Sequence, residues 1–199
     1  MRRALRLFLF PLCVLAAGSA SALAQASPTA TRRLDPAVFV GATGVYTGLG
    51  SGRNLSITTG FDLAFLPVRG FIPALEYRGM YAVDNGHVDS LKNSLGGLKL
   101  SRGHGRLYVY ADLLAGRGET TYANGGYQVP GKIIFYTKSS ANVFSFGGGT
   151  DVFLTDHFAL KVDLQAQHYS SPVTSSGALY SKTGTIGLVY AFRFRNKAR

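Results

Sequence analysis

One histidine and one serine near the C-terminal end of the chain have a spacing that could support hydrolysis. His168 and Ser170 occur as His-x-Ser. A histidine base beside a serine nucleophile, oriented by a carboxylate, is the arrangement that activates serine in acyl transfer. No aspartate or glutamate follows Asp163 in the sequence. The pair is therefore a weak catalytic candidate, and an interfacial histidine beside a loop serine explains the same residues.

A second group of polar side chains has the spacing of a loose metal site. Asp84, His87 and Asp89 lie within six residues of one another and could bind a divalent cation weakly. A solvated loop tip is the interpretation that we adopt, so we predict no metal and no cofactor. The glycines at 48, 50 and 52 precede no helical pattern, so they indicate a turn and no phosphate loop.

The composition indicates one folded domain that is poor in charge. The chain has 199 residues, 16% of them charged, with 13 Phe, 11 Tyr and 25 Gly. Soluble domains have about a quarter of their residues charged. The formal net charge of +11 could suit an anionic partner, but the aromatic residues follow strand patterns and form no basic groove. We expect no nucleic-acid partner.

The N-terminus has the three parts of a secretory signal peptide. Basic residues precede an apolar run over 7–17, and Ala22-Leu23-Ala24 matches an A-x-A cleavage site. We expect a signal peptide at 1–24, with cleavage after Ala26 as the close alternative, and an N-terminal periplasmic segment at 25–36. Beyond the signal, no apolar run is long enough for a membrane-spanning helix.

Processing at this site would also change the chemistry of the chain. Cys13 is the single cysteine and would be removed, so the mature chain would have no thiol. Three arginines would leave with it, and the net charge would fall to about +8. Stability would then have to come from packing or from a membrane.

Beyond residue 36 the dominant pattern is period-two alternation, which predicts strands. In 158–169, for example, Phe158, Leu160 and Val162 share one face and Lys161 and Asp163 the other. Eight such strands are expected, the fourth with the weakest pattern, at 38–47, 55–66, 71–83, 91–101, 106–120, 143–154, 158–169 and 180–194.

The lengths of the connections alternate as well. Those at 67–70, 102–105 and 155–157 are short, whereas those at 48–54, 84–90, 121–142 and 170–179 are mostly longer. Short turns at one end and longer loops at the other are typical of an outer-membrane barrel. Strands that cross a bilayer need about 9–11 residues, and soluble strands average about five or six. The sequence therefore predicts an all-β fold, an eight-stranded antiparallel up-and-down transmembrane β-barrel at 37–194.

In such a barrel lipid solvates the apolar face, and the polar face points inward. An eight-stranded barrel is narrow enough for side chains to fill. Charges of both signs could pair inside, whereas an Arg or Lys facing lipid at mid-depth would cost about 2–4 kcal/mol. A soluble lipocalin-like barrel is the alternative. The expected interior charges are Asp62, Glu76, Arg78, Asp112, Asp151, Lys161, Asp163 and Arg193.

The stretches GGGTDVFLTDHFALKVDLQAQHY and GLVYAFRF resemble the outer-membrane β-barrels of the OmpA and OmpX type, over 37–194. The resemblance implies the outer membrane of a Gram-negative cell, contact with outer-membrane lipid and lipopolysaccharide, and an aromatic signal for the barrel-assembly machinery at Tyr190, Phe192 and Phe194. Family members commonly end on the aromatic residue, but here a basic tail follows at 195–199. A peptidoglycan-binding domain is absent from the pattern.

These features favour a closed, ion-paired barrel with a structural or surface-interaction role and no enzymatic activity. The external loops would contact an extracellular ligand, chiefly the loop at 121–142 with Tyr122, Tyr127 and Tyr136. A narrow, porin-like pore is one alternative. A second is a lipid A deacylase, since His168-x-Ser170 resembles the motif of the PagL type, although Ser171 stands where that family has asparagine.

Basic residues gather on the expected periplasmic side. They could neutralise lipid phosphates of the inner leaflet, contact an anionic wall polymer, or simply keep the rim solvated. The set is Arg32, Arg33, Arg69, Arg102, Arg106, Arg195, Lys197 and Arg199.

Overall fold

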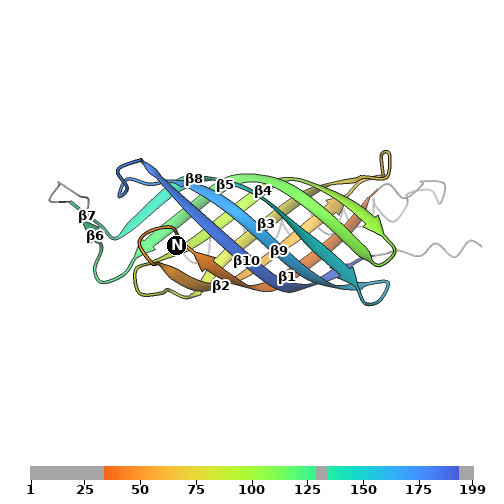
Figure 1. Cartoon of the computed structure of the whole chain (residues 1–199), viewed down its shortest axis with the longest axis horizontal. Coiled ribbons are helices and arrows are strands. Elements are labelled where there is room, and N and C mark those ends of the chain that lie inside the picture. The colour runs from red at the N-terminus through yellow and green to blue at the C-terminus, as the bar shows by residue number, and fades with distance from the viewer. Residues whose placement is uncertain (1–33, 129–133, 193–199) are drawn as a thin grey trace, which may run out of the picture. The chain divides into compact units, whose positions relative to one another are not determined.

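The computed structural model describes residues 34–128 and 134–192, and within them eight long strands close into an antiparallel barrel (Figure 1). Around the barrel the order is β1-β10-β9-β8-β5-β4-β3-β2. The predicted fold class is confirmed. The strands are β1 (Asp35–Tyr46), β2 (Arg53–Ala64), β3 (Ile72–Asp84), β4 (Asp89–His104), β5 (Leu107–Tyr122), β8 (Lys138–Phe153), β9 (Phe158–Ser170) and β10 (Ala178–Ala191).

The remaining two strands, β6 (Tyr127–Gln128) and β7 (Phe135–Tyr136), form a short hairpin at the long-loop end of the barrel (Figure 1). The described residues contain no helix of sufficient length and apolarity to cross a membrane. Several features expected from the sequence lie outside the described residues: the signal peptide at 1–24, residues 25–33 of the periplasmic segment with Arg32 and Arg33, the residues Arg193 and Phe194, and the tail at 195–199.

The loop expected at 121–142 is shorter than the sequence pattern indicates. β5 and β8 stay paired up to Thr121 and Lys138, so the connection covers only 123–137 and contains the β6–β7 hairpin. Ser, Thr and Gly residues at the ends of these strands lack a clear alternation. Hydrogen bonding to the neighbouring strand nevertheless continues the ladder through them.

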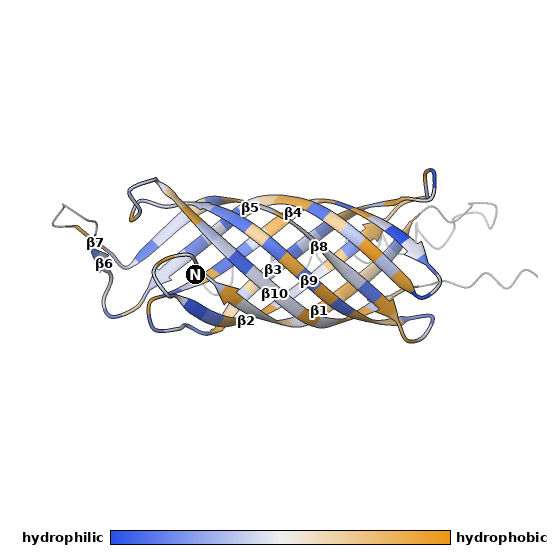
Figure 2. Ribbon diagram, viewed as in Figure 1, coloured by the Kyte–Doolittle hydropathy of each residue, from blue (hydrophilic) through white to orange (hydrophobic). Residues whose placement is uncertain are grey.

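Large apolar side chains cover the outside of the barrel, and Figure 2 shows hydrophobic and hydrophilic residues alternating along its strands. Leu113 is 70% exposed, Leu164 is 68% exposed and Phe146 is 64% exposed. Exposed apolar surface of this extent marks contact with a partner or a membrane, and the alternation with a polar interior is the pattern of a transmembrane barrel. The lipocalin-like alternative is wrong, because a soluble barrel would hold its apolar side chains inside.

The interior has three layers along the barrel axis, and the expected charges form one of them. Charged side chains fill the middle layer. A small cluster of Phe39, Ala159 and Val189 lies toward the short-turn end. Toward the long-loop end lies a larger apolar cluster, here called the outer plug, formed by Val45, Leu49, Met80, Leu91, Leu95, Leu114, Tyr122, Val143, Tyr169, Val173 and Leu179.

The outer plug explains why the fourth strand has a weak alternation. Leu91 and Leu95 of β4 point into the plug, whereas Leu98 and Leu100 face outward. The apolar residues change face in the middle of the strand because the interior changes from apolar to ionic there. A single period-two pattern over 91–101 therefore cannot describe it.

One glycine shows how tightly the interior is filled. A Cβ atom on Gly60 would lie 2.4 Å from Cζ of Phe39 and 2.3 Å from the carbonyl oxygen of Tyr77. A side chain at this position would therefore displace both a ring and a backbone strand. Glycine in β2 lets the Phe39 ring lie flat against the wall beneath the charged layer.

Candidate functional site

Arg78 on β3 is the centre of the charged layer. Its guanidinium donates to Glu76, and its Nη1 atom lies 2.9 Å from Oδ1 of Asp163. Its Nη2 atom lies 3.4 Å from Oδ2 of Asp112. All four side chains are buried. A planar guanidinium with five donors suits such a set of carboxylates better than lysine would.

Lys99 on β4 is the centre of a second group of charges. Its Nζ atom lies 2.8 Å from Oδ2 of Asp62 and 3.3 Å from Oδ2 of Asp151. Lys161 on β9 lies 3.5 Å from the other carboxylate oxygen of Asp151. The two ammonium groups lie 4.0 Å and 4.2 Å from the centroid of the Tyr110 ring, so cation–π contacts add to the ion pairs.

Lys99 is a member of this network that the sequence analysis missed. The other seven members are among the residues expected inside, and each of them is buried within the barrel. The missed signal is the alternation Leu98-Lys99-Leu100, which places one lysine between two lipid-facing leucines. The weak pattern of the surrounding strand obscured it.

The layer holds five carboxylates and three basic groups, so its carboxylates outnumber its cations. Neutral donors also reach these carboxylates. The Tyr110 hydroxyl donates to Asp163 at 2.8 Å, and Nε2 of Gln165 donates to Asp112 at 2.9 Å. Buried charges need such additional hydrogen bonds, because ion pairing alone rarely offsets the loss of hydration.

The outer plug closes the barrel above this layer. Leu49 and Val173 come from the loops after β1 and β9, and both side chains are buried. The Tyr169 hydroxyl lies between Nδ2 of Asn93 at 2.7 Å and Oε1 of Gln167 at 3.1 Å. The plug thus joins two loops to the strands, and its polar lower edge meets the charged layer.

Asp89 does not lie at a solvated loop tip, which corrects the expectation for the group Asp84, His87 and Asp89. It begins β4, it is fully buried, and Oδ1 accepts a 2.7 Å hydrogen bond from the Thr47 hydroxyl. Asp84 and His87 are exposed, and within the part of the chain that the structure describes no three such residues form a possible metal site.

The carboxyl of Asp89 lies on the outer side of the apolar belt, because the outward residues of β4 before Gly96 are Lys92 and Ser94. Burial raises the pKa of this carboxyl to about 6, and the Thr47 hydrogen bond only partly opposes that rise. Through its contact with Thr47, Asp89 anchors the first long loop.

His168 and Ser170 both face outward at the long-loop end of β9. The His168 ring packs edge-on against Tyr180, with 5.1 Å between the ring centroids, and Ser170 is exposed. Among the described residues no carboxylate is hydrogen-bonded or ion-paired to His168. The His168 ring therefore contacts an aromatic ring, whereas the histidine of a catalytic triad is hydrogen-bonded to an acid.

Of the three tyrosines expected in an external loop, Tyr122 is the one that the structure places inside the barrel. Tyr122 ends β5 and is buried in the outer plug, which corrects the expectation for this residue. Tyr127 and Tyr136 lie on the β6–β7 hairpin, partly buried against the plug. The exposed apolar residues here are Ile134 at 46% and Phe135 at 61%.

Aromatic residues near the end of β10 form a ladder on the outside. The Tyr190 ring contacts the rings of Phe158 and Phe192, with centroids 5.1 Å and 4.9 Å apart, and it stacks on His157. These residues lie at the short-turn end, where Arg69, Arg102 and Arg106 also occur. The structure adds basic residues at the other end, which the sequence analysis did not group, namely Arg53, Lys92, Arg117, Lys138 and Lys182.

Comparison with solved structures identifies the fold. Neisserial surface protein A gives a TM-score of 0.50 at 10% identity, covering 80% of this chain and 97% of that chain. Ail of Yersinia pestis gives 0.47 at 11% identity over 81% and 100% of the two chains. The N-terminal barrel domain of Pseudomonas aeruginosa OprF gives 0.41 at 16% identity over 78% and 97%. No family model and no curated protein sequence matches the chain.

Proposed function

We propose that this chain, which has the fold of the small OmpA- and OmpX-like outer-membrane β-barrels, is a closed structural barrel of the outer membrane. The short turns would face the periplasm and the long loops the exterior. In this orientation the β6–β7 hairpin, with Phe135 and Ile134 exposed, is the surface that meets extracellular partners.

The filled interior is the observation that carries this proposal. The outer plug, the charged layer and the Phe39 cluster follow one another along the axis, and each consists of buried side chains. A conducting pore needs a continuous polar path, whereas an eight-stranded barrel is narrow enough for side chains to fill, and here two apolar clusters lie along the axis. The narrow-pore alternative therefore has no support from the packing.

Planar-bilayer recording tests the proposal. The purified, refolded barrel should give no steady single-channel current, and a larger porin reconstituted in the same way provides the positive control. Folding is checked by the change of gel migration on heating. A reproducible unitary conductance from protein that passes this check would refute the closed barrel.

The same proposal includes no catalysis by His168 and Ser170. Cells that express the barrel should retain unmodified lipid A in mass spectrometry. Loss of one acyl chain in these cells, abolished by Ser170→Ala with the barrel still folded, would establish the deacylase alternative instead.

A further inference from the structure

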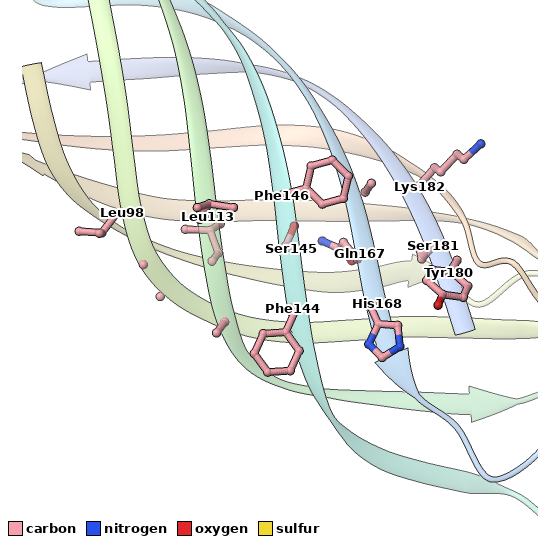
Figure 3. A pocket seen from close by; sticks show the side chains of 15 residues that line it. Leu98, Leu113, Phe144, Ser145, Phe146, Gln167, His168, Tyr180, Ser181 and Lys182 are labelled. Carbon is pink, nitrogen blue, oxygen red and sulfur yellow. The ribbon is translucent and has the colours of Figure 1, made fainter. Parts of the chain in front are cut away.

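The outward wall contains a groove of about 570 Å³ that none of the features above explains (Figure 3). It crosses β4, β5, β8, β9 and β10. Three small outward-facing residues, Gly96, Ala115 and Ala166, form its floor. Larger side chains rise beside them, namely Leu98, Leu113, Phe144, Phe146 and Tyr180. The groove is therefore largely apolar.

The strand register places polar groups at one end of this groove. Phe146 is paired with Ala166, and Ala166 with Lys182, so a row of apolar residues ends at an ammonium group. In the adjacent row Phe144 is paired with His168, and His168 with Tyr180. Figure 3 shows Lys182, His168 and Tyr180 on the same side of the groove. All three lie toward the long-loop end of their strands.

The basic residues at the long-loop end differ in whether a carboxylate neutralises them. Lys92 and Lys138 lie 3.0 Å and 3.6 Å from the carboxylate of Glu119. These two lysines therefore already have a carboxylate partner. Lys182 is exposed and forms no ion pair with any residue that the structure describes. An exposed ammonium group at the edge of an apolar belt is complementary to a phosphate in the headgroup layer.

We propose that this groove binds one phosphorylated lipid of the outer leaflet, with an acyl chain over Ala115 and Ala166 and a headgroup phosphate on Lys182. The Tyr180 hydroxyl and the His168 ring are the neighbouring hydrogen-bonding groups. This inference rests on the proposed membrane location. It assigns a function to the pair His168 and Tyr180 that involves binding and no bond cleavage.

Native mass spectrometry of the detergent-solubilised barrel with bisphosphorylated lipid A tests the site. Lys182→Gln should lower the occupancy of the one-lipid complex about tenfold, as expected for loss of one charged contact. Ala166→Leu should lower it similarly by filling the floor. Two matched controls, Lys92→Gln and Ala42→Leu, change the same residue types outside the groove and should bind like the unmodified chain.

The remaining measurements separate the competing explanations. Inorganic phosphate at millimolar concentration should not displace the lipid, and dephosphorylated lipid A should bind as weakly as to Lys182→Gln. An equal loss of lipid binding in Lys92→Gln would overturn the site, because it would show that lipid is attracted by the overall positive charge of the rim. Displacement of the lipid by phosphate would also overturn it, because the groove would then bind only an anion. Ala115→Leu replaces Ala166→Leu if heat-dependent gel migration shows misfolding, and unchanged binding in both groove variants also overturns the site. Because the bilayer recording of the closed barrel is independent of lipid occupancy, the two proposals fail separately.

Discussion

Arg78 and Asp163 meet at 2.9 Å although they come from opposite walls of the barrel. In the closed order β3 and β9 are four strands apart in either direction. The Arg78 side chain therefore crosses the interior at its widest separation. An interaction of this kind ties the two halves of the barrel together, whereas the strand ladder links only neighbours.

Removing Arg78 should destabilise the barrel strongly. Arg78→Met leaves Asp112 and Asp163 buried without their cation and Glu76 with only Lys99 at 4.0 Å. Breaking a buried pair in this way costs about 3–5 kcal/mol. The free energy of unfolding is measured by urea titration of the barrel in lipid vesicles. Lys92→Met is the control, because its partner Glu119 lies at the exposed rim, where such a pair contributes about 0–1 kcal/mol. Equal losses in the two variants would contradict the role of the charged layer.

Lys99 and Asp62 should be energetically coupled. A double-mutant cycle with Lys99→Met and Asp62→Asn should give a coupling of about 0.5–3 kcal/mol, as expected for contacting buried residues. The matching cycle on the exposed pair Lys92 and Glu119 should give less than about 1 kcal/mol. Additive effects of the first two substitutions would show that the 2.8 Å contact does not form in the folded barrel.

The free-energy cost of placing a charged side chain on the outward face should depend on how deep in the membrane that side chain lies. Leu113→Arg places a guanidinium in the apolar belt and should cost about 2–4 kcal/mol. Ser140→Arg, beside Glu119 at the rim, should cost about 0–1 kcal/mol. Both values come from folding titrations into vesicles. If the two costs were alike, lipid would not be the solvent of this face.

Asp89 should make stability depend on pH. Its folded pKa of about 6 exceeds the ordinary value of 3.8, so the folded chain binds more protons than the unfolded chain between these values. Its contribution to stability is fully present below about pH 4 and is lost as the pH rises through about 6. The stability of Asp89→Asn relative to the unmodified chain should therefore increase from pH 4 to pH 7.

Urea titrations at several pH values measure this difference. Asp84→Asn removes an exposed carboxylate in the same loop region and provides the matched control. A flat difference for Asp89→Asn would mean that this carboxyl is hydrated in the folded protein.

Which features the sequence could predict depends on how locally each one is encoded. The strands and the inward charges follow from alternation between neighbouring residues, as in Lys161 and Asp163, and the closed barrel follows from the number of such strands. The outer plug was missed because Leu91 and Leu95 become internal only once loops bring Leu49 and Val173 over them. That contact joins residues distant in the sequence, and no local pattern records it.

The groove was missed for a related reason. It depends on the register of five strands, which pairs Gly96 with Ala115 and sets Ala166 in the neighbouring row. Each of these residues looks like an ordinary gap in an apolar alternation. Tyr122 is an example of the opposite error. A tyrosine in a glycine-rich stretch suggests a ligand contact, but here the pairing of β5 with β8 extends far enough to place its side chain inside the barrel.

The three longest strands, β4, β5 and β8, have 16 residues each and are adjacent in the barrel, whereas β1 and β2 have 12. At the long-loop end β5 and β8 are joined through the β6–β7 hairpin over 123–137, whereas the connection between β1 and β2 covers only 47–52. The mouth is therefore higher over β5 and β8 than over β1 and β2. We expect large molecules such as antibodies or phage fibres to reach the mouth of the barrel over β1 and β2. The longer strands on the opposite side would obstruct their approach.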